Sequence, residues 1–560
     1  MGLDRLFANS LDRYRNRLCL ACPGHGQKSY GDVIEEADGF QRKLPASKQL
    51  VFIDALNAMP SVVAYLGALR AGHAVHLLDP DKEDDNGALI ETYDPNILVR
   101  CDQDVHEIEL RHDRNLHIHP ELAILLSTSG STGSRKLVKL SRTNIQSNTE
   151  AIVDYLGMNE DDKTVTSLKF HYSYGMSIIN MHLAAGGAIV LTNRSVQEQA
   201  FWDLCKDYGA TNFSGVPYTY EMIDKLGVDF SDFPHLRFLT QAGGKLDQGL
   251  VRRYATLGDQ QGWLFYVMYG QTEAAPRMSY LPPDKAQEHP DCIGVAIPGG
   301  RLSLVDEDHN AIDAVGQEGE LVYEGPNVMM GYAESHRDLV TKDDIERLYT
   351  GDLAIRNDAG LFRITGRQGR FIKPYGLRVS LDDIQDFVGQ HGVRAFVIGR
   401  DRQIVICTEH REIDKEMLPL LADTYQLPVS LFRRQKVDSV PLLSNGKVDY
   451  RSLQSTFLTD EPENTSTSHF LIEFPRQFWA ELSALLIGGS HNWSGVQEIF
   501  EVHFRGKTPT PESSFISLGG DSLLYVEMSV CLQEHLEYLP NKWQYRSISE
   551  LQSMASEYRA

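Results

Sequence analysis

Several common functional signatures are absent from this sequence of 560 residues. It has no G-x-x-x-x-G-K-[ST] loop, which excludes the P-loop NTPases. Its 19 histidines form no H-E-x-x-H pair, and its seven cysteines contain one C-x-x-C, Cys19 and Cys22, without the second pair that a zinc site requires. An odd and small number of cysteines is typical of proteins in a reducing cytoplasm.

Positive charge is scarce. The 54 lysines and arginines face 77 aspartates and glutamates, which gives a formal net charge of −23. This balance argues against a nucleic-acid or anionic-membrane partner. Any site for an anionic ligand must therefore be built locally, from glycine amides, helix N-termini and a few placed cations.

Long apolar runs are also missing. The first residues, MGLDRLFANSLDRYRNRL, carry charges in every turn and have no apolar core of the kind a secretory signal needs. The most apolar stretch, residues 176–192, contains Asn180, His182 and two glycines. It is too short and too polar for a membrane span, so we expect a buried helix followed by a strand. These absences favour a cytoplasmic protein without membrane insertion.

The length and the succession of patterns predict several domains, because one hydrophobic core does not extend over so many residues. From about 50 to 330, short β-rich runs such as LVFIDAL and LAILLSTSG alternate with helical patterns. This alternation is typical of layered α/β structure with largely parallel sheet. Closely spaced strands follow at about 290–365, and then a smaller α+β unit. We predict a multidomain α/β protein.

The last part of the chain differs in character. LTDEPENTSTS, residues 458–468, is acidic and rich in Ser, Thr and Pro, which predicts a linker. The final 80 or so residues have helical patterns. Four apolar residues recur there at i+4 spacing, as on one face of an amphipathic helix: Leu524, Met528, Leu532 and Leu536. The apolar segment 469–489 is compatible with a first helix of this unit or with a segment that packs on the preceding part.

A loop rich in serine and glycine follows the apolar strand LAILL. Residues 127–138 read STSGSTGSRKLV. Such a stretch is poor for helix or strand and suits a loop whose amides and hydroxyls wrap oxyanions, with Lys136 supplying a point charge at its end. Taken alone, a loop of this composition is more often an ordinary connector.

Four further motifs change that interpretation. TSGSTGSRK (128–136) is followed by MYGQTEA (268–274), YTGDLA (349–354), ITGRQGRFIKPYGLRV (364–379) and PLLSNGKVD (441–449). In this order they resemble the signatures of the adenylate-forming ligase superfamily, which comprises acyl- and aryl-CoA synthetases, luciferases and the adenylation domains of nonribosomal peptide synthetases. The resemblance spans roughly residues 1–455.

The resemblance implies a reaction in two steps. In the first, a carboxylate attacks the α-phosphate of ATP, giving an acyl-adenylate and pyrophosphate, and positioning and charge stabilisation dominate such chemistry. Glu273 would bind Mg²⁺, Thr272 the α-phosphate and Asp352 the ribose hydroxyls. The further ATP- or AMP-binding residues that the resemblance implies are Thr128, Ser129, Gly130, Ser131, Thr132, Gly133, Lys136, Gly243, Gly244, Tyr269, Gly270 and Arg367.

Lys447, in the turn SNGKVD, matches the family's catalytic lysine, whose ammonium would draw the carboxylate and the α-phosphate together. In the second step a thiol attacks the acyl carbon and expels AMP after a rotation of the small domain. The hinge position is Gly369, where relatives have Asp or Lys. Glycine tolerates large dihedral changes but has no side chain to fix either state. Lys373 and Gly376 would line the tunnel for the thiol.

The sequence determines the identity of the acid less closely than it determines the reaction. Amino-acid-activating relatives hold the substrate ammonium with an Asp, and the matching position here is Gly175. Because a buried ammonium without a carboxylate partner is costly, a fatty, hydroxy or aryl acid is favoured, and an amino acid held differently stays an alternative. Tyr172 stands where many relatives have His. The predicted substrate-pocket residues are Tyr172, Gly175, Met176, Tyr218 and Met268.

FISLGGDSL (515–523) resembles the attachment motif of acyl and peptidyl carrier proteins. Ser522 lacks the G-x-S-x-G context of a nucleophile, because Leu524 replaces the second glycine. A helix N-cap and an attachment point are compatible roles for it. The motif implies an all-α four-helix carrier domain with 4′-phosphopantetheine on Ser522. The predicted organisation is an N-terminal adenylation subdomain (1–366), a C-terminal subdomain (367–457), a linker (458–475) and the carrier (476–560).

We therefore expect an AMP-forming ligase that uses ATP and Mg²⁺ to adenylate a small carboxylic acid and loads it onto its own phosphopantetheine arm. This implies a phosphopantetheinyl transferase and a downstream acyl-accepting enzyme as partners. One alternative is an acyl-CoA ligase that releases a free CoA thioester. Another is an acyl-carrying scaffold with an inactive ligase, against which the intact motif residues argue: Lys136, Glu273, Asp352, Arg367 and Lys447.

Overall fold

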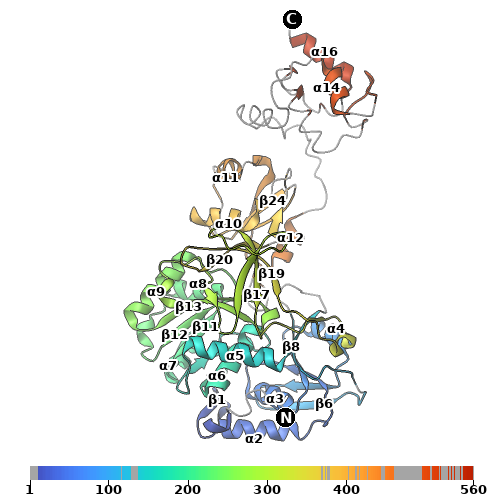
Figure 1. The fold of residues 1–560 in the computed structure, drawn as a ribbon. Coiled ribbons are helices and arrows are strands. Elements are labelled where there is room, and N and C mark those ends of the chain that lie inside the picture. Colours follow the sequence, from blue (N-terminus) through green and yellow to red (C-terminus); the bar gives the residue numbers. More distant parts are fainter. Residues whose placement is uncertain are drawn as a thin grey trace. The chain divides into compact units, whose positions relative to one another are not determined.

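The computed structural model describes residues 11–458 with short gaps, and parts of 495–558. The gaps are 115, 128–135, 368–369, 373, 375–378, 402, 410–412, 415–416, 426 and 443–447. In the last part it describes 495–504, 508–515, 518, 528, 531–532, 535–536, 543 and 546–558. The chain divides into two compact units, residues 1–365 with 442–448 and residues 366–441 with 449–560 (Figure 1).

The first unit contains a nine-stranded sheet with a parallel centre. In sheet order its strands are β15 (Val295–Ala296), β14 (Arg277–Leu281), β13 (Leu264–Gly270), β12 (Phe238–Gln241), β11 (Asn212–Gly215), β9 (Lys163–Val165), β10 (Ala188–Val190), β1 (Leu18–Cys22) and β2 (Gly26–Ser29). The six strands from β13 to β1 pair in parallel, whereas β14, β15 and β2 pair antiparallel. The prediction of largely parallel sheet is confirmed here.

A seven-stranded sheet lies in the same unit. Its order is β18 (Tyr332–Ala333), β8 (Leu137–Ser141), β7 (Leu122–Ser127), β4 (Ala74–Leu78), β3 (Leu50–Asp54), β5 (Ile97–Cys101) and β6 (His106–Leu110). Strands β7, β4, β3 and β5 are parallel, and β8, β18 and β6 join antiparallel. The parallel strands are nearly continuous apolar runs because both faces of such a sheet are covered.

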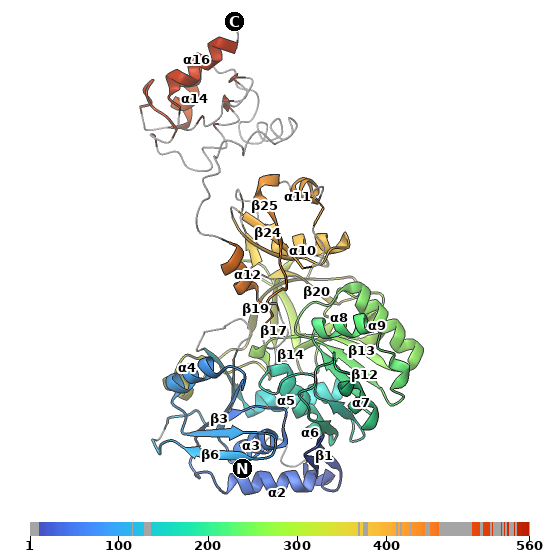
Figure 2. The same ribbon diagram turned by 180° about the vertical axis from the view of Figure 1, so that it is seen from behind.

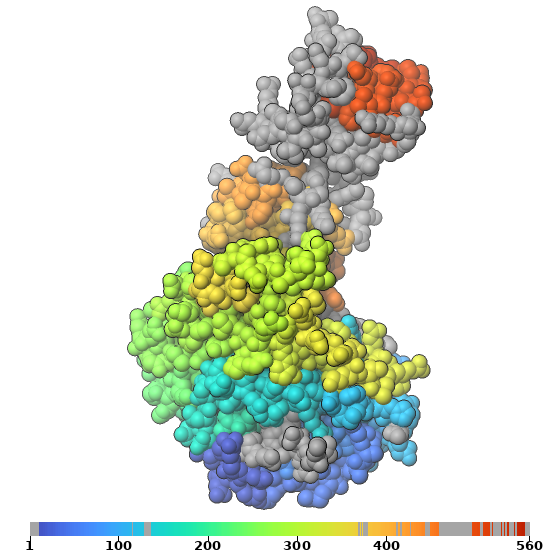
Figure 3. All heavy atoms as spheres, in the orientation of Figure 1, coloured from blue at the N-terminus to red at the C-terminus, as the bar shows by residue number. Residues whose placement is uncertain are grey.

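Helices separate and cover these strands. They are α2 (Tyr30–Gln41), α3 (Met59–Arg70), α4 (Glu83–Tyr93), α5 (Arg142–Leu156), α6 (Ser173–Ala185), α7 (Gln199–Asp207), α8 (Pro217–Leu226) and α9 (Gln248–Gln261). Helix α2 lies against α3, as Figure 2 shows from behind. Helix α5 is buried on one side and forms part of the surface on the other, coloured cyan in Figure 3. The stretch 176–192 contains most of α6 and then β10, as predicted.

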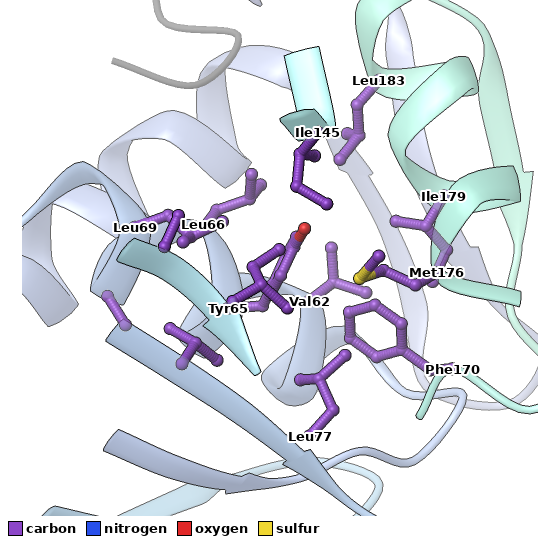
Figure 4. Close-up of a cluster of buried hydrophobic side chains, with 14 of the residues drawn as sticks. Val62, Tyr65, Leu66, Leu69, Leu77, Ile145, Phe170, Met176, Ile179 and Leu183 are labelled. Carbon is purple, nitrogen blue, oxygen red and sulfur yellow. The ribbon is translucent and has the colours of Figure 1, made fainter. Parts of the chain in front are cut away.

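One large hydrophobic core joins α3, α5 and α6 to the strands between them. Tyr65 of α3 packs edge-on against Phe170, with ring centroids 5.3 Å apart. Met176 of α6 lies beside the same ring, and Ile179 belongs to the same cluster (Figure 4). Burial of this many apolar side chains, at about 1.5–3 kcal/mol each, stabilises the layered unit.

A four-stranded sheet follows, with order β16 (Arg301–Val305), β17 (Gly319–Glu324), β19 (Leu348–Arg356) and β20 (Phe362–Arg367). Strands β16, β17 and β19 pair antiparallel. The sequence predicts closely spaced strands with glycine turns at about 290–365, and this sheet confirms them.

The second unit begins with a small α+β region. Its elements are β21 (Phe371–Ile372), β22 (Val379–Ser380), α10 (Leu381–Gln390), β23 (Phe396–Arg400), β24 (Gln403–Thr408), α11 (Met417–Tyr425), β25 (Phe432–Lys436) and α12 (Tyr450–Phe457). It has a hydrophobic core of its own, built around Ile384, Val397 and Ile406.

A separate cluster of buried side chains lies near the C-terminus. Helices α14 (Val496–His503) and α16 (Ile548–Tyr558) contribute to it. Trp543 is 1% exposed and its ring lies 5.1 Å from that of Phe515. Three residues of the predicted i+4 stripe are buried in this cluster: Met528, Leu532 and Leu536. Ser522, Leu524 and the segment 469–489 lie outside the described residues.

In the described part of the chain, no helix combines the length and apolar character needed to cross a membrane.

Candidate active site

Most of the predicted site residues that the structure describes follow neighbouring strands of the nine-stranded sheet. Tyr218 comes after β11, Gly243 and Gly244 come after β12, and the segment 269–273 ends β13 and continues beyond it. These strands are parallel, so their carboxyl ends meet at one edge of the sheet. Open α/β sheets bind ligands at this edge.

A hydrogen-bonded cluster joins β13 to β19. The Tyr269 hydroxyl donates to Oδ2 of Asp352 at 2.5 Å. The side-chain amide of Gln271 donates to the same oxygen at 3.1 Å and to the Thr350 carbonyl at 2.9 Å. Asp352 is 8% exposed, so these donors stabilise a nearly buried carboxylate. The structure thus brings together the residues expected at adenine and at ribose.

A second cluster is centred on Tyr332 of β18. The Lys136 ammonium lies over its ring, 3.6 Å from the centroid. The Tyr332 hydroxyl donates to Oε1 of Glu273 at 3.0 Å. Strand β18 pairs with β8, and Lys136 directly precedes β8, which explains how residues so distant in sequence meet. One tyrosine therefore orients both the predicted phosphate-binding lysine and the predicted magnesium ligand.

Thr272 faces the start of α6. Its hydroxyl lies 3.4 Å from that of Ser173, the first residue of this helix. A helix N-terminus carries partial positive charge and free N–H groups, which favour an anion. The arrangement suits an α-phosphate or a carboxylate beside Thr272.

At two positions a backbone carbonyl oxygen lies so close that only glycine fits. A Cβ on Gly270 would lie 1.8 Å from the Pro276 carbonyl oxygen, because β13 and β14 pair closely there with a bulge. A Cβ on Gly175 would lie 2.1 Å from the Lys169 carbonyl oxygen. Gly175 therefore has a packing reason to be glycine, and an aspartate at this position would not fit the backbone.

The predicted pocket residues separate into two environments. Tyr172, Tyr218 and Met268 belong to one apolar cluster between α5, α6 and β13, in which the two tyrosines are partly exposed. The Met268 sulfur accepts a hydrogen bond from the Tyr155 hydroxyl at 2.9 Å. Met176 lies instead in the core with Phe170, fully buried.

Burial controls the protonation of this cluster. It raises the pKa of Tyr172 to about 12, against the opposing effect of the nearby Arg277. The adjacent His171 has its pKa lowered to about 4 by burial, which Asp79, 3.5 Å away, opposes. Tyr172 is thus a neutral donor at physiological pH, and His171 is directed toward Asp79.

The segment after β12 is held by Gln241. Its side-chain amide donates to the Gly244 carbonyl at 2.8 Å. Gly244 also lies close to the Pro217 ring, where an added Cβ would come to 3.2 Å. Tyr218 follows Pro217 and is hydrogen-bonded by the Gln197 amide at 3.5 Å.

The remaining predicted residues are Arg367 and those outside the described part of the chain. Arg367 ends β20 and is exposed. The others lie outside the described residues: Thr128, Ser129, Gly130, Ser131, Thr132, Gly133, Gly369, Lys373, Gly376, Lys447 and Ser522.

Four residues of the site are not among those predicted from sequence: Ser173, Gln271, Arg277 and Tyr332. Gln271 lies inside MYGQTEA, so its position between predicted site residues indicated that it belongs to the site. Arg277 was detectable as a cation in the apolar strand RMSYL. Tyr332 had no local signal, because its role depends on pairing between β8 and β18.

The donor set near Glu273 fits a magnesium ion with phosphate ligands. Among the described residues, no three His, Cys, Asp or Glu side chains gather as a metal-ligand group. The Glu273 carboxylate has one hydrogen bond, from the Tyr332 hydroxyl, and makes no ion pair with a described side chain. Mg²⁺ in nucleotide enzymes typically uses one or two carboxylates together with phosphate oxygens, which matches this arrangement.

Known proteins resemble this chain in sequence and in fold. Residues 103–333, less than half of the chain, match the family model described as AMP-binding enzyme. The solved structure of ATP-bound MatB from Rhodopseudomonas palustris aligns with a TM-score of 0.67 at 21% identity, over 81% of this chain and 98% of MatB. The chain therefore has the fold of this enzyme, and its residues 103–333 are similar to AMP-binding enzymes.

Its curated relatives are synthetases and ligases. The chain is 26% identical to the PKS-NRPS hybrid synthetase acdB of Aspergillus candidus over 95% of its own length and 22% of the synthetase. It is 31% identical to a long-chain-fatty-acid–CoA ligase of Escherichia coli over 48% of each chain. The chain thus spans under a quarter of that synthetase, and the alignment covers about half of that ligase.

Proposed function

We propose that this protein activates a carboxylic acid with ATP and loads it onto a phosphopantetheine arm attached to its own Ser522. In the first step a carboxylate oxygen attacks the α-phosphorus, the bond from that phosphorus to the bridging oxygen breaks, and pyrophosphate leaves. In the second step the thiol sulfur attacks the acyl carbon, the bond to the phosphate oxygen breaks, and AMP leaves.

The observation that carries the first step is the convergence on Tyr332. Lys136 lies over its ring and Glu273 accepts its hydroxyl, beside Thr272 and the start of α6. A cation, a carboxylate suited to Mg²⁺ and a helix N-terminus in one place would stabilise the triphosphate charge while the acid attacks. Magnesium bound through Glu273 would neutralise charge on the phosphates. Lys447 would approach the reacting oxygens as the second cation.

The nucleotide would be held on the Tyr269 side. Tyr269 would stack on adenine while its hydroxyl keeps Asp352 oriented toward the ribose hydroxyls. Gln271 donates to the same carboxylate oxygen. A preorganised acceptor of this kind loses little entropy on binding.

The extent of the alignments supports a carrier at the C-terminus. The synthetase relative aligns over 95% of this chain, whereas the CoA ligase aligns over 48%. The last part of the chain also has its own apolar cluster around Phe500 and Trp543, as expected of a small helical domain. We therefore favour loading on Ser522 over release of a CoA thioester. We also favour a fatty, hydroxy or aryl acid over an amino acid, because Gly175 leaves no room for a carboxylate at its position.

One experiment tests this function. The full chain is converted with a phosphopantetheinyl transferase and incubated with ATP, Mg²⁺ and mixed acids, and the mass of the Ser522 peptide is measured. We expect the arm plus one acyl group there, and no protein-bound thioester in Ser522→Ala. A thioester in Ser522→Ala would refute the attachment site. Faster acylation of free CoA than of the holo-protein would favour the acyl-CoA ligase, and no acid-dependent ATP–pyrophosphate exchange would favour the inactive scaffold.

A further inference from the structure

Arg277 is a buried cation beside the predicted acyl pocket. It opens β14 opposite Gly270 of β13 and is 3% exposed. Its backbone is fixed, since its N–H donates to the Asn148 side chain and its carbonyl accepts from Asn148 and Asn327. Two buried asparagine side chains thus fix the backbone at Arg277.

The guanidinium has only neutral partners among the described residues. Its carbon lies 4.0 Å from the centroid of the Tyr174 ring. Its Nε donates to the Met268 sulfur at 3.4 Å, and the side chain also forms a hydrogen bond with Tyr155. A guanidinium has five N–H donors, and a thioether is a weak acceptor. Arg277 makes no ion pair with any described carboxylate.

Two other arginines of the same unit are paired with carboxylates. Arg237 donates to both oxygens of the fully buried Asp162, each at 2.6 Å. Arg70, whose side chain is 8% exposed, pairs with Asp38 at 2.7 Å. Burial of an unpaired charge is strongly unfavourable. Within the described part of the chain, no carboxylate supplies the anion that the burial of Arg277 calls for.

The position of Arg277 indicates where this anion comes from. Residues 268 and 269 are consecutive on β13, so their side chains face opposite sides of the sheet. Tyr269 points toward Asp352, the nucleotide side, whereas Met268 contacts Arg277. Tyr172 and Tyr218 are two of the five partly exposed members of the same cluster. The missing anion thus belongs to the acid side of the site, not to ATP.

We propose that Arg277 determines the acid specificity, and that the acid carries a second carboxylate, remote from the reacting one, which pairs with this guanidinium. The inference rests on the proposed function and deepens it. A planar carboxylate fits the guanidinium fork with two parallel hydrogen bonds. The same cation would repel a substrate ammonium, which disfavours amino acids whose ammonium enters this part of the pocket.

The test compares dicarboxylic acids with their monomethyl esters, which keep the shape and lose one charge. Acid-dependent ATP–pyrophosphate exchange is measured on the full chain for aliphatic and aromatic pairs. We expect kcat/KM for the preferred diacid to exceed that of its ester by about a hundredfold or more, since an unpaired buried charge is penalised to that extent. The wild-type comparison needs no variant and is unaffected by folding defects.

Variants of Arg277 then show whether this residue causes the preference for diacids. Arg277→Met should lower kcat/KM for the diacid by about a hundredfold and change that of the ester by less than tenfold, while Arg277→Lys should retain part of the preference. Arg194→Gln removes a positive charge from an exposed ion pair with Glu198 and serves as the control. Melting curves of each variant confirm folding.

Calorimetry with a non-hydrolysable ATP analogue separates the remaining outcomes. Binding of the analogue should change by less than threefold in Arg277→Met, and a large loss would assign the residue to phosphate and overturn the proposal. A second result would overturn the proposal while the proposed function stands. Monocarboxylic acids and esters would then support exchange with the same kcat/KM as the diacids, and Arg277→Met would leave these values unchanged. Absence of exchange with every acid would refute the proposed function itself, and the inference with it.

Discussion

The Tyr269 hydroxyl donates to Oδ2 of Asp352 at 2.5 Å, and this bond joins the end of a parallel strand to an antiparallel sheet 83 positions further along the chain. Gln271 donates to the same oxygen. The carboxylate expected to bind ribose is therefore oriented before a nucleotide arrives, by side chains that lie next to the expected adenine position.

Replacing Tyr269 by Phe should weaken ATP binding while keeping the aromatic face. The loss of one hydrogen bond to a charged group corresponds to about 1.5 kcal/mol, or roughly a tenfold rise in the KM for ATP. Steady-state pyrophosphate exchange at varied ATP measures it. Tyr208→Phe, at the partly buried residue after α7, is the control. A KM for ATP equal to wild type in Tyr269→Phe would contradict the role of this bond.

Tyr332→Phe should mainly change the dependence on magnesium. It removes the donor to Glu273 but keeps the ring beneath Lys136, so the Mg²⁺ concentration for half-maximal exchange should rise about three- to tenfold. Tyr332→Leu should in addition raise the KM for ATP, because Lys136 loses its aromatic partner. Identical magnesium curves for Tyr332→Phe and wild type would show that Tyr332 does not position the metal ligand.

Lys447→Ala should abolish adenylation and spare thioester formation from a supplied acyl-adenylate, because the lysine is expected to act in the first step alone. We expect a loss of exchange by a factor of at least about 100, as for removal of a group that stabilises transition-state charge. The exposed Lys225→Ala on α8 is a matched control. Wild-type exchange in Lys447→Ala would remove Lys447 from the mechanism.

Gly175→Ala should destabilise the first unit by about 2 kcal/mol or more, since its Cβ would overlap the Lys169 carbonyl oxygen at 2.1 Å. Gly87→Ala, in the middle of α4 with nothing within 4 Å of the added carbon, should be neutral or stabilising by up to about 1 kcal/mol. Urea unfolding midpoints of both variants test the pair. An equal change in the urea midpoint for both variants would show that the backbone at Gly175 shifts to accommodate the added carbon.

Stability should fall as the pH drops from about 6.5 to 4. Burial lowers the pKa of His73, His76 and His171 to about 4, below the ordinary value of 6.5, so within this window the unfolded chain binds protons that the folded chain does not. Each group contributes a slope of up to about 1.4 kcal/mol per pH unit, which ends near pH 4.

Unfolding free energies measured across this window test the slope. His76→Gln should make it shallower, while His117→Gln at an exposed position should leave it as in wild type. A slope that does not change in His76→Gln would mean that this histidine is protonated in the folded state as well.

The sequence by itself determined the layered fold and the order of the motifs. The succession of apolar runs and helical patterns is a local property, so β3, β7, β12 and α6 were predictable from the sequence. The motif MYGQTEA likewise placed Tyr269, Thr272 and Glu273 together, because they are neighbours in the chain.

Only the tertiary structure decided which distant side chains support them. Tyr332 reaches Glu273 and Lys136 through the pairing of β8 with β18, and sequence spacing contains no information about that register. Gly175 was predicted as a pocket wall, but a backbone approach explains why it is glycine. Arg277 shows the same limit: whether a cation in a strand reaches solvent, a carboxylate or neither depends on packing, and here packing surrounds it with tyrosines and a thioether.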